Sequence, residues 1–454
     1  MTNKISPLNF RKNAAQAVKD KSLRHAMRTA TDMFIAKRGE GVAAVPIEVW
    51  RDQASAIRLE VLDNLPDYVD RFSFHATKAG AVVHHACDAE TARETIFHIL
   101  KDRGARKIVK SKSMITEEIH LNEYLEDQDF HVVETDLGEY IVQIAGEKPS
   151  HILAPAIHKT RSQVGELFSE KLNVPYSDDP AVLTKIARNV LRQEFLTADA
   201  GISGANFAVA SSGSLAIFTN EGNGRMVTTL PPLHIAVFSI EKIIPTLNDL
   251  SLFTKLLPRS ATGQMLSSYV SIITGSRKPG ESTGTKELHI VLLDNGRSEI
   301  LKGEYREILK CIRCSACFNV CPVYRAIGGH AYGVTYPGPM GMVLTSLLEG
   351  IDKVYPLLDA TTLCGACVEV CPVRVPLVKL LTMLREERVS KGLTPLTERA
   401  AMAMYGVATK RPSVFSLAQR TSKALWPVLS RITGKGRLDR LPVPAPQRFS
   451  GRNS

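Results

Sequence analysis

The 454-residue sequence contains no long hydrophobic run. Although 44% of its residues are hydrophobic, no stretch approaches the roughly 18 uninterrupted apolar residues of a membrane-spanning helix. The N-terminal residues MTNKISPLNFRK also lack the apolar core of a secretory signal. We therefore expect a cytoplasmic protein, in which cysteines stay reduced, rather than a secreted or membrane-spanning one.

Glycine-rich nucleotide-binding motifs are absent as well. The sequence contains neither the G-x-G-x-x-G fingerprint nor the Walker pattern. The segment Gly201-Ile202-Ser203-Gly204 neither follows an expected strand nor opens an expected helix, so it is not such a fingerprint. We expect turn and cap roles for the nearby Asp199, Asn206, Glu221 and Asn223, with the lining of a pocket as the alternative. The loop Lys110–Met114 does lie between an expected strand and an expected helix, where α/β folds bind anions. A solvated loop with a capping residue is the simpler interpretation, and anion binding is the alternative.

Acidic residues are nearly absent from the C-terminal region. Between residues 401 and 454, ten Lys or Arg residues stand against one acid, Asp439, so this tail carries +9 of the total net charge of +11. The rest of the chain carries +2, and acids such as Asp32 and Glu40 interrupt its basic N-terminal segment, so we expect no nucleic-acid binding. The basic tail either contacts a membrane surface or an acidic partner, or packs on its own chain with a disordered end.

Cysteine is concentrated, because seven of the eight cysteines fall in two short runs. The first run reads C-I-R-C-S-A-C-F-N-V-C-P and the second reads T-L-C-G-A-C-V-E-V-C-P. They contain Cys311, Cys314, Cys317 and Cys321, followed by Cys364, Cys367 and Cys371. Thiolates three residues apart allow one loop to bind several irons of a cubane, and the first run is the complete bacterial ferredoxin pattern. The two runs predict two iron–sulfur clusters, most simply of the [4Fe-4S] type.

The division of these ligands follows from the ferredoxin pattern, in which the last cysteine of a run binds the other cluster. Cluster 1 then takes Cys311, Cys314, Cys317 and Cys371, and cluster 2 takes Cys321, Cys364 and Cys367. A complete second run would have cysteine at position 361, where this chain has Thr361. Cluster 2 therefore has a non-cysteine fourth ligand or is a [3Fe-4S] centre. Structural zinc and disulfides are the alternatives, but zinc leaves Cys317, Cys371 and the prolines after each run without a role.

Other candidate ligands have weaker support. His84 and His85 alternate along an expected strand and face opposite sides, which excludes a joint metal site. Cys87 is expected to be a small buried side chain, with ligation of cluster 2 as the alternative. His330 is expected to hydrogen-bond locally, with the same alternative. No catalytic constellation can be assigned from the twelve histidines and their neighbours.

The order of expected elements predicts an α/β domain with a mainly parallel sheet, followed by an α-helical ferredoxin-type module. We expect a helical N-terminal cap over 1–65, the α/β domain over 66–298, the two-cluster iron–sulfur domain over 299–395, and a basic region over 396–454 that is partly helical and then disordered. Within the cap, Ser22 is expected to start one helix. A helix over Ser298–Leu309 should lead into Cys311. The expected strands are 81–86, 107–111, 130–135, 207–210, 214–219, 226–230, 234–240, 269–274 and 287–293, with a hairpin at Ser211–Gly213.

Three stretches together resemble the lactate utilisation protein B family. They are C-I-R-C-S-A-C-F-N-V-C-P-V-Y-R-A-I-G-G-H, G-I-S-G-A-N-F-A-V-A-S-S-G-S-L-A-I-F-T-N-E-G-N-G-R and K-S-K-S-M-I-T-E-E-I. The resemblance spans nearly the whole chain and implies that a lactate-utilisation domain precedes the cysteines. It also implies a non-catalytic iron–sulfur subunit that passes electrons during oxidation of L-lactate to pyruvate, together with two other lactate-utilisation proteins and an electron acceptor.

Two other functions stay open on the residues alone. In one, an enzyme uses the incompletely ligated second cluster as a Lewis acid on a hydroxy acid. In the other, the clusters are structural or sensory. Our expectation is an electron conduit in which neither cluster binds substrate.

Overall fold

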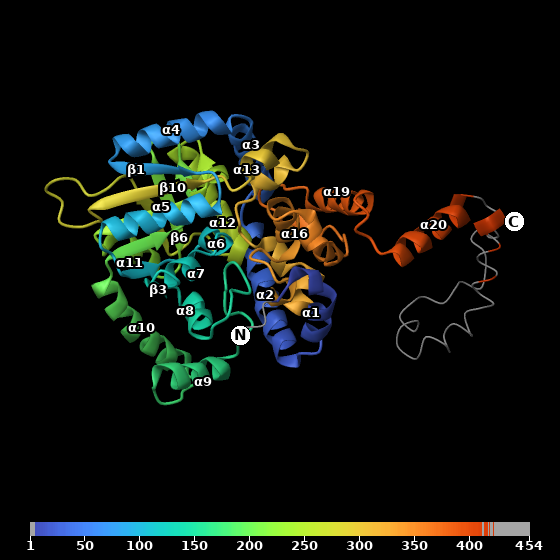
Figure 1. The fold of residues 1–454 in the computed structure, drawn as a ribbon, viewed down its shortest axis with the longest axis horizontal. Helices are drawn as coiled ribbons and strands as arrows, with labels where there is room; N and C mark the ends of the chain where they lie inside the picture. Colours follow the sequence, from blue (N-terminus) through green and yellow to red (C-terminus); the bar gives the residue numbers. More distant parts are fainter. Residues whose placement is uncertain (1–4, 411–412, 416, 418–420, 422–454) are drawn as a thin grey trace. The chain divides into compact units, whose positions relative to one another are not determined.

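The computed structural model describes residues 5–410, 413–415, 417 and 421. The chain divides into two compact units, Met1–Glu386 and Glu387–Ser454. The first unit contains both sheets and all seven cysteines of the two runs (Figure 1). In the second unit, helix α20 spans Leu396–Lys410, and most of the expected disordered basic tail lies outside the described residues. Among the described residues, no helix is long and apolar enough to cross a membrane.

The larger sheet has six strands, and every adjacent pair in it is parallel, as alternating strands and helices predict. Its strand order is β1-β10-β7-β4-β2-β3. Its strands are β1 (Ala81–Ala86), β2 (Lys107–Lys110), β3 (His131–Glu134), β4 (Ala200–Ser203), β7 (Leu233–Ser239) and β10 (Glu287–Leu293). The central strand β7 is buried along its whole length, which is typical of a parallel strand covered on both faces.

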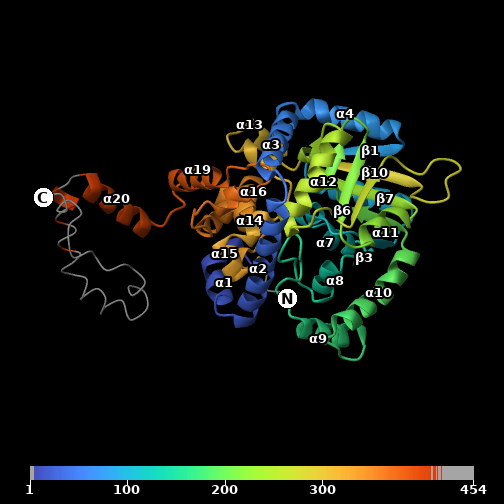
Figure 2. The same cartoon turned by 180° about the vertical axis from the view of Figure 1, so that it is seen from behind.

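Helices pack on both faces of this sheet (Figures 1 and 2). On one face, Val291 and Leu293 of β10 join a core with α5 (Ala89–Asp102), α6 (Met114–Glu118) and α7 (Leu121–Glu126). On the other face, Ile290 of β10 packs with Phe72 of α4 (Leu65–Lys78). Alternation along β10 thus supplies both cores. Further along the sheet lie α8 (Leu137–Ile144), α9 (Arg161–Leu172), α10 (Pro180–Thr197) and α11 (Asn223–Thr229).

A second, four-stranded sheet lies beside the first, with strand order β8-β5-β6-β9. Its strands are β5 (Phe207–Val209), β6 (Ser214–Thr219), β8 (Ile243–Ile244) and β9 (Tyr269–Ile273). Strands β5 and β6 form an antiparallel hairpin, so the turn expected at Ser211–Gly213 is confirmed. The pairing of β8 with β5 is parallel and was not expected from the sequence.

The N-terminal segment is helical and packs on the rest of the first unit. It comprises η1 (Pro7–Asn9), α1 (Phe10–Ala17), α2 (Lys21–Ala43), α3 (Ile47–Asp63) and α4. The carboxylate of Asp20 caps α2 by accepting from the Leu23 N–H, so the expected cap at Ser22 is wrong by two residues. Helix α2 passes the end of α12 (Leu247–Thr262) so closely that a Cβ on Gly41 would lie 2.4 Å from the Gly263 carbonyl oxygen. Glycine is therefore required at this crossing.

The cysteine-bearing region contains helices and no strand between residues 297 and 390, which confirms the α-helical ferredoxin-type module. Short helices, several of them one turn long, alternate with loops around the cysteines. They are α13 (Arg297–Lys302), η3 (Arg306–Lys310), α14 (Ala316–Asn319), α15 (Pro322–Ile327), η4 (His330–Tyr332), α16 (Gly338–Leu348), α17 (Ile351–Val354), η5 (Tyr355–Asp359), α18 (Ala366–Glu369) and α19 (Leu377–Ser390).

Three sequence-based assignments are wrong. The expected strand at 226–230 is helix α11, whose Val227 packs on the sheet. No strand is expected at Gly201–Gly204, yet Ala200–Ser203 form strand β4, where Gly201 lets α11 approach so closely that a Cβ would lie 2.0 Å from the Val227 carbonyl oxygen. The single helix expected over Ser298–Leu309 is broken at Gly303. In the first two cases long-range packing overrides the local pattern.

The buried His234 makes stability depend on pH. Its Nε2 lies 2.7 Å from the Ser203 Oγ of β4, and burial lowers its pKa to about 3. The unfolded chain binds a proton near pH 6.5 whereas the folded chain does not, so stability from this group is full above about pH 6.5 and is lost as the pH falls toward 3. We expect the free energy of unfolding to fall by about 1.4 kcal/mol per pH unit there, and His234→Gln to remove that part of the slope.

Urea unfolding at several pH values between neutral and mildly acidic conditions measures this slope. The exposed His25 supplies the control, and His25→Gln should leave the slope unchanged. A wild-type slope in His234→Gln would contradict the prediction.

Candidate iron–sulfur site

Four of the seven cysteines line one cavity. Cys311, Cys314 and Cys317 reach it from the loop around α14, and Cys371 reaches it from the loop after α18. Burial raises the pKa of the Cys314 thiol, and the nearby thiols of Cys311 and Cys371 raise it further, so these sulfurs lie close together. The structure therefore brings together residues that are sixty positions apart along the chain.

The backbone of this loop explains how three sulfurs converge. Arg313 and Ser315 have positive φ values of 60° and 58°, which turn the chain twice between Cys311 and Cys317. Within this loop the Arg313 N–H donates to Cys311 Sγ at 3.4 Å, and in the second cysteine segment the Val375 N–H donates to Cys371 Sγ at 3.2 Å. Hydrogen bonds of this kind stabilise negative sulfur and tune the potential of a cluster.

The other three cysteines form a second group. Burial raises the pKa of the Cys367 thiol, and the nearby thiols of Cys321 and Cys364, and more weakly that of Cys371, raise it further. Cys321 is the N-cap residue of α15, where burial raises the pKa of its thiol and the backbone N–H groups of Val323 and Tyr324 oppose that rise. Cys367 is buried, whereas Cys364 is exposed. The second group thus lies next to the first and has one sulfur at the surface.

Thr361 occupies the position where a complete second run would have cysteine. Its Oγ1 accepts a hydrogen bond from the Leu363 N–H at 3.0 Å. The following residue, Thr362, hydrogen-bonds to Cys364, and the Ala366 N–H together with that bond lowers the pKa of the Cys364 thiol. The Thr361 oxygen therefore already has a backbone donor, and the threonine that interacts with the second group is Thr362.

The donor set fits an iron–sulfur cluster. Burial raises the pKa of Cys314 and of Cys367 to about 12, so these thiols do not ionise at neutral pH unless a cation replaces the proton. Only sulfur atoms are offered by the first group, and backbone N–H groups surround them. An iron–sulfur cluster requires such a site, because its irons bind thiolates and N–H···S hydrogen bonds stabilise the negative charge on sulfur.

A buried ionic network supports the first cysteine loop from the α/β side. Glu241 follows β7 and has no exposed surface, with Arg297 at 2.9 Å and Arg313 at 3.2 Å from its two oxygens. Burial alone would raise the pKa of Glu241, but the two guanidinium groups hold it at about 2. Arg297 also forms a bidentate salt bridge with Glu118 of α6. Arg313 stacks over the Tyr336 ring at 5.4 Å.

Two arginines of α3 hold the backbone on which the cysteines stand. The buried guanidinium of Arg58 donates to the carbonyl oxygens of Leu309 at 2.8 Å and Lys310 at 3.2 Å, just before Cys311. The Arg51 Nε donates to the Cys371 carbonyl oxygen at 2.9 Å. Because Arg51 and Arg58 lie two helical turns apart, one helix face fixes both cysteine segments.

The minor ligand candidates lie elsewhere or are otherwise engaged. Cys87 is exposed and contacts Asp88 and Thr91, so the expectation that it is buried is wrong. His84 stacks on His289, with Nε2 to Nδ1 at 3.0 Å, and His85 faces away from it toward Ser73.

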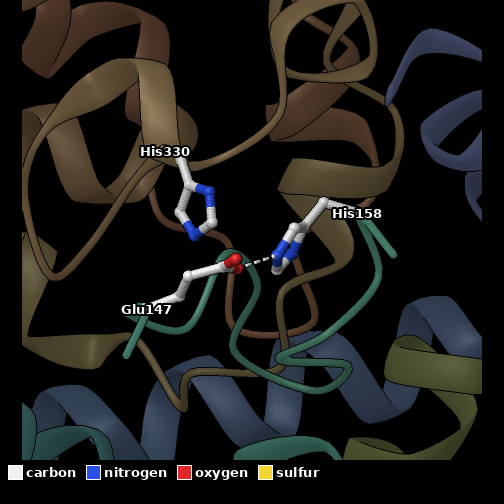
Figure 3. A group of neighbouring side chains, drawn as sticks. All are labelled: Glu147, His158 and His330. Atoms are coloured by element: carbon white, nitrogen blue, oxygen red, sulfur yellow. Dashed lines mark hydrogen bonds and ion pairs between the residues drawn. The ribbon is translucent and has the colours of Figure 1, made fainter. Parts of the chain in front are cut away.

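His330 hydrogen-bonds locally, as expected, through Nε2 to the Lys148 carbonyl oxygen at 2.7 Å. It lies beside His158 and Glu147 (Figure 3), and the ligand atoms of these three residues are within 4.8 Å of one another. Glu147 is already bound by the His158 Nε2 and by the ammonium of Lys159, each at 2.6 Å. The lysine supplies the positive charge that a metal ion would bring.

Arg51, Arg58, Glu241 and Arg297 were not singled out from the sequence. Charged residues in helices and loops are mostly exposed, so nothing in the local pattern marks these as buried. The single available signal was the position of Arg313 inside the first cysteine run, where a cation next to several thiolates has an electrostatic role.

Comparison with known proteins identifies both parts of the first unit. The LUD domain family matches residues 69–293, and the 4Fe-4S dicluster domain family matches residues 307–375. The dicluster match confirms iron–sulfur chemistry for the cysteine region. A DUF162 family protein from Deinococcus radiodurans superposes with a TM-score of 0.27 at 16% identity, covering 50% of this chain and 98% of that one, which is too low to support a fold argument.

Relatives align over nearly the whole chain. Lactate utilization protein B of Bacillus licheniformis is 44% identical over 427 residues, covering 93% of this chain and 90% of that protein. The protein of the same name from Shouchella clausii is 43% identical over 461 residues, covering 99% and 97%. The one from Lysinibacillus sphaericus is 42% identical over 467 residues, covering 100% and 98%. At this identity and coverage, the chain belongs to the lactate utilization protein B family.

Proposed function

We propose that this chain is the iron–sulfur electron-transfer subunit of a system that oxidises L-lactate to pyruvate. The observation that carries the proposal is the grouping of the seven cysteines into two adjacent sets, one lining a cavity and one reaching the surface at Cys364. Two neighbouring redox centres of this kind form a path for electrons. The lactate role comes from the family, whose members are named for lactate utilisation.

In this proposal, cluster 1 is held by Cys311, Cys314, Cys317 and Cys371, and cluster 2 by Cys321, Cys364 and Cys367. Both are [4Fe-4S] centres when complete, and cluster 2 has a non-cysteine fourth ligand or loses one iron to become [3Fe-4S]. The cavity around the first four sulfurs and the electrostatic coupling within the other three support this division.

Cluster 2 is the centre that exchanges electrons with a partner. Cys364 is exposed whereas the sulfurs of Cys314 and Cys371 are buried, so cluster 2 is the more accessible of the two. The partners are two other lactate-utilisation proteins and an electron acceptor. The proposed peripheral membrane contact through the basic tail rests on residues that are mostly outside the described part of the chain.

Anaerobic purification of the full chain tests this function. We expect about seven or eight irons per chain, with EPR signals of two centres, and the oxidised spectrum separates a three-iron from a four-iron cluster 2. L-lactate should reduce the clusters only when the two partner proteins are present.

Three outcomes contradict the proposal. Lactate turnover by this chain alone with an artificial acceptor would make it an enzyme rather than a conduit. A spectral shift of cluster 2 on adding a hydroxy acid, without reduction, would favour Lewis-acid chemistry. A colourless protein with zinc in place of iron would exclude clusters altogether.

A further inference from the structure

A large cavity lies between the parallel sheet and the first cysteine loop. Its volume is about 320 Å³, at the lower end of the range for small-molecule sites. The segments that follow β2, β4 and β7 line it, at the edge where open α/β sheets bind ligands. Arg313, from the loop between Cys311 and Cys314, lines the opposite side.

Lys112 is the feature that marks this cavity as a binding site. Lys112 lines the cavity, and its Nζ is buried without a hydrogen-bond partner and without a carboxylate in ion-pair distance. Acids lie at longer range, with Asp136 contributing most, and burial lowers the pKa of Lys112. A buried ammonium without a partner is costly, so a chain retains one where a ligand satisfies it.

The neighbouring Lys110 shows what a structural buried lysine looks like in the same loop. Its Nζ lies 2.6 Å from Glu134 and 2.7 Å from the Thr116 hydroxyl, with Glu117 at 3.4 Å. Lys110 is therefore fully paired within the protein, and it does not line the cavity. The difference between the two lysines indicates that Lys112 is not merely part of the core.

The other lining groups define the chemistry of the ligand. Lys242 and Arg313 add two cations, and Asp136 and Glu221 are the two acids. Arg313 is already paired with Glu241, so the unpartnered Lys112 is the group that calls for an anion. The buried Asn223 Oδ1 lacks a donor and is suited to accept from a hydroxyl group. Apolar side chains complete the wall, and they include Phe218, Phe238, Leu257 and Pro258.

From these contacts we infer that the cavity binds a small carboxylate that carries a hydroxyl or oxo group, with Lys112 as its principal anion-binding residue. The identification as a 2-hydroxy or 2-oxo acid, such as L-lactate or pyruvate, rests on the proposed function. The cavity and its unpartnered polar groups are observed in the structure and do not depend on the proposed function. Arg313 lines the cavity and donates to the Cys311 carbonyl oxygen, so a ligand bound in the cavity alters the surroundings of the first cysteine loop.

The test is isothermal titration of the full-length, cluster-loaded chain with L-lactate and with pyruvate, using acetate and inorganic phosphate as comparison ligands. We expect saturable binding of at least one of the two acids, weaker binding of acetate and phosphate, and a change in the circular dichroism of cluster 1 at saturation. Lys112→Met removes the ammonium while keeping the length of the side chain, and it should weaken binding at least tenfold.

Lys107→Met is the matched control, because Lys107 is an exposed lysine at the start of β2, the strand that leads into the loop of Lys112. Its affinity should equal that of the wild type, and both variants should retain full iron content. If neither acid binds, if Lys112→Met binds as tightly as the wild type, or if phosphate binds more tightly than both acids, the inference is overturned. Lactate-driven reduction of the clusters through the partners is a separate measurement, so the proposed function stands or falls independently.

Discussion

Replacing Cys371 with alanine is expected to abolish cluster 1, although Cys371 belongs to the second cysteine run. The reason is the shared cavity, which Cys371 lines with Cys311, Cys314 and Cys317. Conversely, Cys321→Ala should abolish cluster 2, although Cys321 belongs to the first run, because its thiol lies with Cys364 and Cys367. Each variant should lose roughly half of the bound iron, since one of two cubanes is lost.

EPR spectroscopy of anaerobically prepared variants checks this exchange of ligands. The spectrum of Cys371→Ala should match that of Cys311→Ala, and the spectrum of Cys321→Ala should match that of Cys364→Ala. The exposed Cys87, which contacts neither group, supplies the control, and Cys87→Ala should keep both signals. If Cys371→Ala instead matches Cys364→Ala, each run binds its own cluster and the proposed division is wrong.

Replacing Glu241 with glutamine is expected to cost roughly 3–5 kcal/mol of the free energy of unfolding, as when one partner of a buried ion pair is removed. Glu241 is fully buried between Arg297 and Arg313. Glutamine has nearly the same shape but no charge, so both guanidinium groups lose their shared anion. Arg313 is part of the first cysteine loop, and we therefore also expect faster loss of cluster 1.

The urea midpoint followed by far-ultraviolet circular dichroism measures the first effect, and the rate of bleaching of the visible absorption under a chelator measures the second. Glu299→Gln is the matched control because Glu299 pairs with Lys302 at the surface, where ion pairs contribute little. If Glu241→Gln unfolds at the same urea midpoint as Glu299→Gln, the buried network does not stabilise the fold.

The features that the sequence predicted well are those whose signal is local. Cysteine spacing identified iron–sulfur chemistry because one loop must place several thiolates at fixed intervals. Alternating strands and helices predicted the parallel sheet, and strands such as β1 and β10 lie where the pattern placed them. The loop Lys110–Met114 was assigned to a strand-to-helix connection correctly, but its simpler interpretation as solvated is wrong, because Lys110, Ser111 and Ser113 are buried and so is the Nζ of Lys112.

The errors arise where packing against distant residues decides the local structure. No strand was expected at Gly201-Ile202-Ser203, yet these residues form an interior strand of the sheet, and Gly201 leaves the space into which the Val227 carbonyl oxygen of α11 fits. Residues 226–230 have strand propensity but form part of α11, which packs on that strand. Such pairings depend on contacts between segments more than twenty residues apart, and a pattern read over a few neighbouring residues does not include them.

The sequence by itself predicted iron–sulfur ligation by two cysteine runs, an α/β domain followed by a helical module, and a basic C-terminal region. Only the tertiary structure decided that Arg51 and Arg58 fix both cysteine segments, that Glu241 joins the sheet to the first loop, and that Lys112 stands unpaired in a cavity beside it. The physical reason is that ligand spacing is a property of neighbouring residues. The burial and pairing of a charge depend on which distant segments fold around it.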